Sequence, residues 1–276
     1  MEKQCIIISV FNDGVYDLAL NHLTSLRNQN ITNYMAFTTG AKTFADFKEK
    51  GFNIKFLEAN NLQAGKLEWN KQEFNKFNAL RYELMKQALT TYKYVWYLDV
   101  DTVVLDDLNK YISLTDTAFD CKLQDDISMP CTGCMLLKRT DQTLVLINMI
   151  LKSLRQWKYQ HNDQLCLRDV LSKYFGWAST PTELQASRQG RRGPKYTIKL
   201  KMFDRATFPN GLLFFDEESR GLHRDAPERA ADKQHLTEKD KYEAIPNKSP
   251  AFVHANWMLG NEKKITAFKK YGLWFI

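Results

Sequence analysis

Two aspartates, Asp99 and Asp101, directly follow a continuous apolar run that ends at Leu98. Such runs are typical of strands buried on both faces of a parallel sheet, and ligands bind at the carboxyl ends of these strands. Neighbouring carboxylates repel each other unless a cation neutralises them, so the pair predicts a site for a hard divalent metal ion. A turn or helix-capping role is the alternative, but Asp106 and Asp107 can already cap the next helix.

The Asp-x-Asp pattern suits two kinds of enzyme. In one, the carboxylates hold Mg²⁺ or Mn²⁺, which bridges the diphosphate of a nucleotide-sugar. In the other, a haloacid-dehalogenase-like phosphohydrolase, Asp99 is the nucleophile and Asp101 the acid/base. Thr102 falls one position early for the phosphatase pattern, and Asp125 and Asp126 come too soon to be its late acidic pair. The pattern therefore favours a nucleotide-sugar enzyme.

Composition excludes several classes of protein. The chain has 276 residues, of which 44% are hydrophobic, so it is not intrinsically disordered. Its net charge of +7 permits a third hypothesis, a nucleic-acid or anionic-membrane binder that uses the basic segment 188–205. We disfavour this hypothesis because the charge is mild and the segment has no recognition helix, so no nucleic-acid partner is expected. Five scattered cysteines predict free thiols, and the lack of a long apolar window predicts a soluble, cytoplasmic protein without a transmembrane segment.

The periodicity of apolar residues predicts alternating strands and helices. Strands are expected at 5–11, 34–39, 52–57, 94–98, 133–138 and 251–254. Helices are expected from Tyr16, from Phe74, over 142–154, over 163–174, and in a final segment through Phe268. The segments 187–201 and 217–248 are charged and irregular, and we expect solvated loops there. Together these elements predict an α/β fold with a mostly parallel central sheet flanked by helices.

Five short motifs occur in an order that points to one family. They are NKFNALR at 75–81, YLDVD at 97–101, TGCML at 132–136, NDQ at 162–164 and HANW at 254–257. In this order they resemble the nucleotide-diphospho-sugar transferases of the GT-A fold, a family that includes plant cell-wall xylosyl-, arabinosyl- and galactosyltransferases. The resemblance spans about residues 5–270, and the segments 187–201 and 217–248 match nothing in it.

The resemblance implies a fold and an activity. It implies one Rossmann-like GT-A domain over residues 1–276, with about 1–125 binding the nucleotide-sugar and a less regular part, about 126–276, facing the acceptor. The expected reaction is metal-dependent transfer of a sugar from a UDP-sugar to a hydroxyl of a glycan or glycoprotein. Xylose is the first expectation for the sugar, and galactose or another hexose the second. Mn²⁺ or Mg²⁺ is the expected cofactor.

The resemblance also implies roles for single residues. Asp101 would be the principal metal ligand, and Asp99 would bind the metal through water or hold the ribose hydroxyls. His254 would complete the metal shell. The alternative is that His254, beside apolar Val253, is a histidine of the protein core. The residues expected to contact the nucleotide or its diphosphate are Phe11, Asn12, Asp13, Thr38, Lys76, Asp99, Val100, Asp101, Gly260, Lys263 and Lys264. On its helix Arg81 lies about 140° around the axis from Lys76, so the two cannot share a contact, and Arg81 is interpreted as structural.

Asp163, in the NDQ motif, is the expected catalytic residue. If the enzyme inverts the anomeric centre, Asp163 would take the proton of the acceptor hydroxyl, and if it retains configuration, Asp163 would hold sugar hydroxyls. A helix N-cap is the alternative role. Cys131 and Cys134 resemble half of a zinc site, but no second pair follows, so we interpret them as strand and loop residues.

Overall fold

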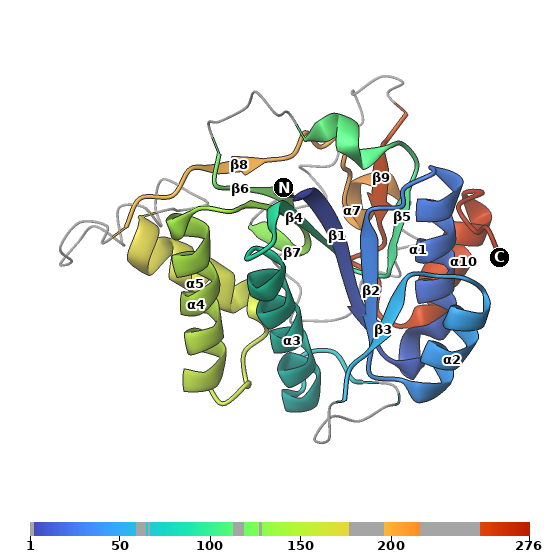
Figure 1. The fold of residues 1–276 in the computed structure, drawn as a ribbon, viewed down its shortest axis with the longest axis horizontal. Coiled ribbons are helices and arrows are strands. Elements are labelled where there is room, and N and C mark those ends of the chain that lie inside the picture. Colours follow the sequence, from blue (N-terminus) through green and yellow to red (C-terminus); the bar gives the residue numbers. More distant parts are fainter. Residues whose placement is uncertain are drawn as a thin grey trace, which may run out of the picture.

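The structure, a computed structural model, describes residues 3–58, 65, 67–112, 119–126, 129–176, 196–215 and 249–276. Its centre is a seven-stranded sheet with the strand order β3-β2-β1-β4-β7-β6-β8 (Figure 1). The strands are β1 (Lys3–Phe11), β2 (Tyr34–Thr38), β3 (Ile54–Phe56), β4 (Tyr92–Leu98), β6 (Cys121–Asp125), β7 (Pro130–Lys138) and β8 (Leu200–Met202). Only β7 is antiparallel to its neighbours, so the predicted, mostly parallel α/β sheet is confirmed.

Helices cover both faces of this sheet (Figure 1). One face carries α1 (Tyr16–Asn28) and α2 (Ala41–Glu49), and the other carries α3 (Gln72–Ala88), α4 (Asp141–Gln156) and α5 (Asp163–Phe175). Beside α1, the short strands β5 (Thr102–Val104) and β9 (Phe252–His254) form a separate antiparallel ladder. On the side of α1, the helix α10 (Asn261–Lys270) contributes to a separate core cluster with α1, β5 and β9. The remaining short elements are η1 (Asp13–Val15), η2 (Leu108–Tyr111) and α7 (Gly211–Phe214).

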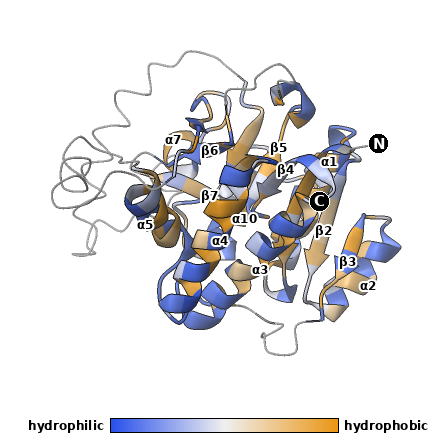
Figure 2. Ribbon diagram, turned by 60° about the vertical axis from the view of Figure 1, so that its left-hand side comes forward, coloured by the Kyte–Doolittle hydropathy of each residue, from blue (hydrophilic) through white to orange (hydrophobic). Residues whose placement is uncertain are grey.

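The apolar run of β1 is buried on both sides, as a continuous run predicts. Ile7 packs in the core under α1 and α2, whereas Ile6 and Ile8 pack in the core under α3, α4 and α5. Figure 2 shows the result, with hydrophobic strands inside and helices that turn hydrophilic sides outward. Among the described residues, no helix is both long and apolar enough to cross a membrane.

The predicted elements match the observed ones with small changes at their ends. The helix expected over 142–154 is Asp141–Gln156, and the strand expected at 133–138 begins earlier, at Pro130. The expectation of a solvated loop up to residue 201 was wrong at its end, because Leu200–Met202 forms β8 beside β6. A three-residue edge strand with exposed Lys201 and Met202 gives no apolar alternation to detect. Residues 187–195 and 217–248 lie outside the described residues.

Candidate active site

Asp99, Asp101 and His254 meet beyond the end of β4. The chain leaves β4 at Leu98 and enters β5 at Thr102, and the register of β5 with β9 pairs Thr102 with His254. One ligand atom from each of the three residues lies within 4.8 Å of the others. His254 Nε2 is 3.3 Å from Asp101 Oδ1. The structure therefore assembles the three residues that were predicted as metal ligands from positions about 150 residues apart in the chain.

Gln124 of β6 fixes the tautomer of His254. The Gln124 side-chain amide nitrogen donates to the backbone carbonyls of Phe208 and Pro209, at 3.3 and 2.9 Å. Its oxygen therefore faces His254 Nδ1, at 2.8 Å, and accepts the hydrogen that this nitrogen carries. The lone pair of neutral His254 is then on Nε2, toward Asp101, as a metal ligand requires. No sequence motif pointed to Gln124.

Gly133 of β7 keeps the space between these ligands open. A Cβ atom at this position would collide with the imidazole of His254 and with Asp99 Oδ2. The donor set of two carboxylates and one imidazole suits Mn²⁺ or Mg²⁺, with the imidazole favouring Mn²⁺. The chemistry of the ligands, the histidine tautomer and the space beside Gly133 all fit a divalent ion.

Lys264 of α10 supplies the positive charge nearest to Asp101. Its Nζ lies 2.6 Å from Asp101 Oδ2. Burial by itself would raise the pKa of Asp101, but Lys264 and His254 outweigh burial and hold this pKa well below the usual range. For His254, burial lowers the pKa, and the charges of Asp101 and Asp99 reverse this effect, so its pKa is raised. Asp101 is therefore a carboxylate that is stabilised by the Lys264 ammonium and the His254 imidazole, both from the C-terminal part of the chain.

Arg81 of α3 joins Asp99 to Asp163. Its side chain is only 4% exposed, with Nη1 3.0 Å from Asp99 Oδ1 and Nη2 in contact with Asp163 Oδ2. Nη2 also donates to Thr132 Oγ1, at 3.2 Å, and the Tyr97 hydroxyl donates to Asp99 Oδ1, at 2.8 Å. Burial lowers the pKa of Arg81, but the two carboxylates raise it well above its ordinary value, so the guanidinium stays charged. Arg81, interpreted from the sequence as structural, thus lies at the centre of the site.

Asp163 is surrounded by hydrogen-bond donors from α3. Besides Arg81, the Tyr82 hydroxyl donates to Oδ2, at 2.7 Å, and the Asn78 amide donates to Oδ1, at 3.3 Å. The N-cap of α5 is Asn162, whose side chain accepts from the backbone N–H of Leu165. The alternative role for Asp163 as an N-cap is therefore wrong, because its carboxylate turns inward to α3.

The residues predicted to contact the nucleotide at the ends of β1 and β2 make hydrogen bonds within the loops that follow these strands. Asn12 Nδ2 donates to the Gly65 carbonyl, at 2.8 Å, and its Oδ1 accepts from Gly14 N–H. Asp13 accepts from the backbone N–H of Thr43, at 3.0 Å, and from its hydroxyl, and so caps α2 from outside. Thr38, Phe11 and Val100 are buried, and Thr38 Oγ1 accepts from Gly40 N–H.

Two of the three lysines predicted to contact the nucleotide or its diphosphate, Lys76 and Lys263, make no contact with Asp99 or Asp101 among the described residues. Lys76 lies 2.6 Å from Glu73 on its own helix, and no contact links it to the carboxylates among the described residues. Of Lys263 and Lys264, only Lys264 contacts Asp101. Gly260 precedes α10 with φ of 90°, a left-handed conformation that suits glycine.

Asp126 collects donors from two segments that flank the site. Gln164 of α5 donates to its Oδ2, at 2.9 Å, and the Asn256 amide and Trp257 indole donate to its Oδ1, at 2.9 and 2.6 Å. Burial raises the pKa of Asp126 above its ordinary value, and these hydrogen bonds oppose that rise. The carboxylate thereby ties the start of α5 to the segment after His254.

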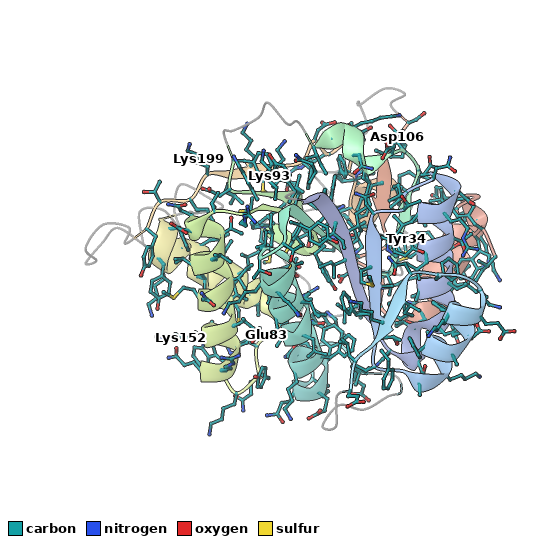
Figure 3. All side chains as sticks on the ribbon, viewed as in Figure 1. Tyr34, Glu83, Lys93, Asp106, Lys152 and Lys199 are labelled. Atoms are coloured by element: carbon teal, nitrogen blue, oxygen red, sulfur yellow. The ribbon has the colours of Figure 1, made fainter. Side chains whose placement is uncertain are left out.

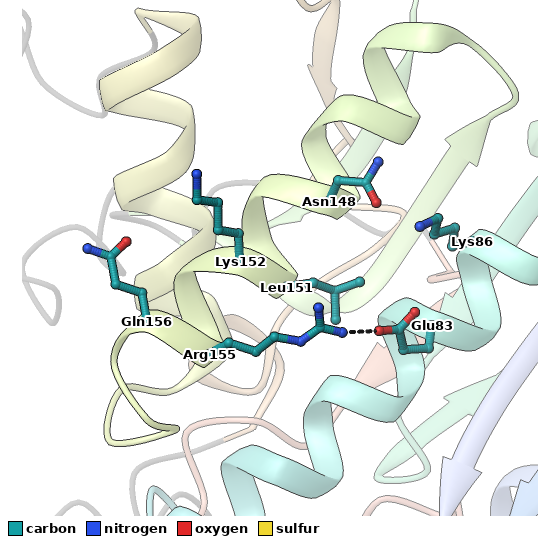
Figure 4. A pocket seen from close by; sticks show the side chains of 7 residues that line it. All are labelled: Glu83, Lys86, Asn148, Leu151, Lys152, Arg155 and Gln156. Carbon is teal, nitrogen blue, oxygen red and sulfur yellow. Dashed lines mark hydrogen bonds and ion pairs between the residues drawn. The ribbon is translucent and has the colours of Figure 1, made fainter.

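Cys131 and Cys134 are buried free thiols of β7, and Cys131 Sγ lies 3.8 Å from His254 Nδ1. A hollow between α3 and α4 is lined by seven residues, three of them basic, and contains an Arg155–Glu83 ion pair of 2.6 Å (Figure 4). Glu83 belongs to α3 and Lys152 to α4 (Figure 3). None of the predicted site residues lines this hollow.

Solved glycosyltransferases share this architecture. The glycosyltransferase GlyE of Streptococcus pneumoniae aligns with a TM-score of 0.53 and 8% identity, over the whole of this chain and 65% of GlyE. The galactosyltransferase LgtC, solved with donor and acceptor sugar analogs, aligns with a TM-score of 0.50 and 11% identity, over 97% of this chain and 96% of LgtC. The chain therefore has the GT-A glycosyltransferase fold.

The family assignment comes from the sequence. The family model described as nucleotide-diphospho-sugar transferase matches residues 29–268, and the chain belongs to this family. A curated relative, the UDP-galactose:fucoside alpha-3-galactosyltransferase of Dictyostelium discoideum, is 24% identical over 184 residues, which are 66% of this chain and 24% of the relative. The chain thus spans about a quarter of that relative's length. Of the three hypotheses from the sequence, family membership agrees with the nucleotide-sugar transferase rather than with the phosphohydrolase or the basic binder.

Proposed function

We propose that the protein transfers a sugar from a UDP-sugar to a hydroxyl of a glycan or glycoprotein, with Mn²⁺ or Mg²⁺ held by Asp99, Asp101 and His254. The observation that carries this proposal is the cluster itself, whose ligand atoms lie within 4.8 Å of one another around the space beside Gly133. When bound, the ion supplies positive charge for the diphosphate of the departing nucleotide. Asp101 and His254 would bind it directly, and Asp99 would bind it directly or through water.

Lys264 is the protein group best placed to help the diphosphate leave. Its ammonium lies on Asp101 and belongs to the first turn of α10, where backbone N–H groups also favour anions. Lysine is a point charge on a flexible stem, so Lys264 can turn from Asp101 to a phosphate. Lys263 would take a secondary part, and Phe11, Asn12, Asp13, Thr38 and Val100 would form the nucleoside side of the site.

Asp163 is proposed to hold hydroxyls of the transferred sugar. Both of its oxygens already accept hydrogen bonds, from Asn78, Arg81 and Tyr82, and its side chain is 4% exposed. A carboxylate so fully engaged is suited to fixed polar contacts rather than to taking up a proton. Because the curated relative is a UDP-galactose enzyme, UDP-galactose is tested first and UDP-xylose second.

A thermal-shift screen tests the proposal. Unfolding is followed with UDP, UDP-galactose, UDP-xylose, UDP-glucose and GDP-mannose, each with and without Mn²⁺. A ligand that binds the native state raises the unfolding temperature by mass action, so UDP with Mn²⁺ should stabilise the protein and the correct donor should stabilise it further. The Asp101→Asn variant should lose this gain. Equal stabilisation by UDP with Mn²⁺ in that variant would remove the metal site from the proposal.

A further inference from the structure

The turn between α4 and α5 carries an aromatic pair. Trp157 is 45% exposed, and His161 is half-buried. The ring of His161 stacks on it, with centroids 4.4 Å apart and planes at 6°. The turn follows the end of α4, where Arg155 is paired with Glu83 of α3 (Figure 4). A single exposed apolar side chain is not evidence of a binding site. Whether Trp157 belongs to one therefore depends on the conformation of the turn and on its position relative to the active site.

The backbone of this turn is held in a costly conformation. Lys158 and Tyr159 have φ of 49° and 58°, in the left-handed region that non-glycine residues rarely adopt. Two side chains of α3 hold their carbonyls in place. Gln72 Nε2 donates to Lys158 O, at 2.9 Å, and buried Asn75 Nδ2 donates to Tyr159 O, at 2.9 Å. Such conformations persist where the surroundings enforce them, and they concentrate at ligand sites.

The same helix holds the turn and Asp163. Gln72 and Asn75 bind the turn, and Asn78 and Arg81, further along α3, bind Asp163. These four residues are spaced three positions apart, so each contact lies about 60° around the helix axis from the one before it. His161 stands two residues before Asp163, and two residues of chain span at most about 7 Å. The turn that carries the aromatic pair is therefore held next to Asp163.

We propose that Trp157 and His161 form an acceptor subsite for an oligosaccharide, which binds a sugar ring beyond the one that carries the reacting hydroxyl. This inference rests on the proposed function, since it needs an acceptor glycan whose reacting end is beside Asp163. The apolar C–H face of a pyranose packs against a flat aromatic ring and releases water from both surfaces. The His161 ring already orients the indole, so binding costs little side-chain freedom.

Substitutions at an exposed ring separate this role from a structural one. Trp157→Ala removes the platform, and Trp157→Phe keeps a flat ring. Arg155→Ala is the matched control, because it alters an exposed residue two positions earlier without touching the aromatic pair. Fluorescently labelled proteins are applied with UDP and Mn²⁺ to an array that carries each glycan as a monosaccharide and as longer chains. Thermal unfolding of each variant confirms that it is folded.

We expect selected oligosaccharides to bind to the wild type, to Trp157→Phe and to Arg155→Ala. They should bind at least tenfold more weakly to Trp157→Ala. UDP-sugar hydrolysis should be the same in all four proteins. Equal oligosaccharide binding by Trp157→Ala overturns the subsite, as does a wild type that prefers no oligosaccharide to its monosaccharide. Loss of binding to phosphatidylglycerol vesicles in Trp157→Ala, without change on the array, would assign the turn to a membrane surface instead. Absence of UDP stabilisation and hydrolysis in wild type would count against the proposed function alone.

Discussion

The two aspartates that follow β4 are neutralised in different ways. Asp99 shares with Asp163 a buried guanidinium from the middle of α3, and Tyr97 and Tyr82 add hydroxyl donors to the same carboxylates. Asp101 instead faces an ammonium and an imidazole that come from the last helix and the last strand. One side of the site, around Arg81, is formed by α3, β4 and α5, and the other, around Asp101, depends on the C-terminal segment.

This difference divides the site into two parts. We call Arg81 with Asp99 and Asp163 the permanent frame, and Asp101 with Lys264 and His254 the exchangeable side. Arg81 is always charged and planar, so it can bond two carboxylates at once and fix their positions. Lys264 is a single flexible charge, and His254 presents an imidazole nitrogen, so Asp101 can exchange these partners for a metal ion. We therefore expect the Arg81 side to keep its shape with or without substrate, and the Asp101 side to rearrange when a metal ion or a diphosphate binds.

The largest effect is expected from Asp101→Asn. The amide loses the charge that binds a metal and puts a donor where an acceptor is needed, so sugar transfer should fall by about 1,000-fold or more, a loss of about 4 kcal/mol of transition-state stabilisation. The measurement is transfer from the donor identified by thermal shift. Asp106→Asn is the control, since Asp106 pairs with exposed Lys110 outside the site. Full activity of Asp101→Asn would show that Asp101 is not an exchangeable metal ligand.

Arg81→Met tests the permanent frame. It leaves the buried carboxylate of Asp163 and that of Asp99 without their cation, which should lower the free energy of unfolding by about 3–5 kcal/mol. Urea unfolding measures the loss. Arg155→Met, which breaks an exposed pair with Glu83, should cost at most about 1 kcal/mol. If the two variants lose equal stability, Arg81 does not hold the buried carboxylates in place more firmly than an exposed ion pair would.

The exchangeable side was easier to predict from sequence than the frame. Asp99 and Asp101 stand next to a buried strand, and the HANW motif drew attention to His254, so three of the assembled groups carried a local signal. Arg81 ends the NKFNALR motif, but the motif did not show that its partners are Asp99 and Asp163, which are 18 and 82 residues away. Gln124 was missed for the same reason. The fold followed from apolar periodicity, whereas the short strands β5 and β8 are defined by pairing partners far along the chain.

Gln124→Leu tests how far the metal side depends on its support. The leucine leaves His254 Nδ1 without its acceptor, so the imidazole is free to rotate and to change tautomer. Removing such an outer partner costs about 10–100-fold in metal affinity. Mn²⁺ binding, followed by electron paramagnetic resonance, should weaken by this factor. Unchanged affinity would mean that the tautomer of His254 is set by something other than Gln124.

His22 lies beneath the turn from Asp99 to Thr102, which carries both aspartates. Its protonation is expected to have the smallest effect, a loss of stability at acid pH. Thr102 Oγ1 donates to the Asp99 carbonyl, so it accepts from His22 Nδ1, while Ser9 donates to His22 Nε2. Burial lowers the pKa of His22 from 6.5 to about 4. The stability that this neutral histidine contributes is complete above pH 6.5 and is lost as the pH falls from 6.5 toward 4, because the unfolded chain binds the proton first.

At pH 5 this loss amounts to about 2 kcal/mol of the free energy of unfolding. Urea unfolding at pH 7 and pH 5 should show it in wild type, and the difference should shrink by a similar amount in His22→Gln. If His22→Gln keeps the wild-type difference, acid acts through other groups. A smaller difference in the variant would show that the turn carrying both aspartates rests on a neutral histidine, so that acid weakens the turn while Arg81 keeps its charge.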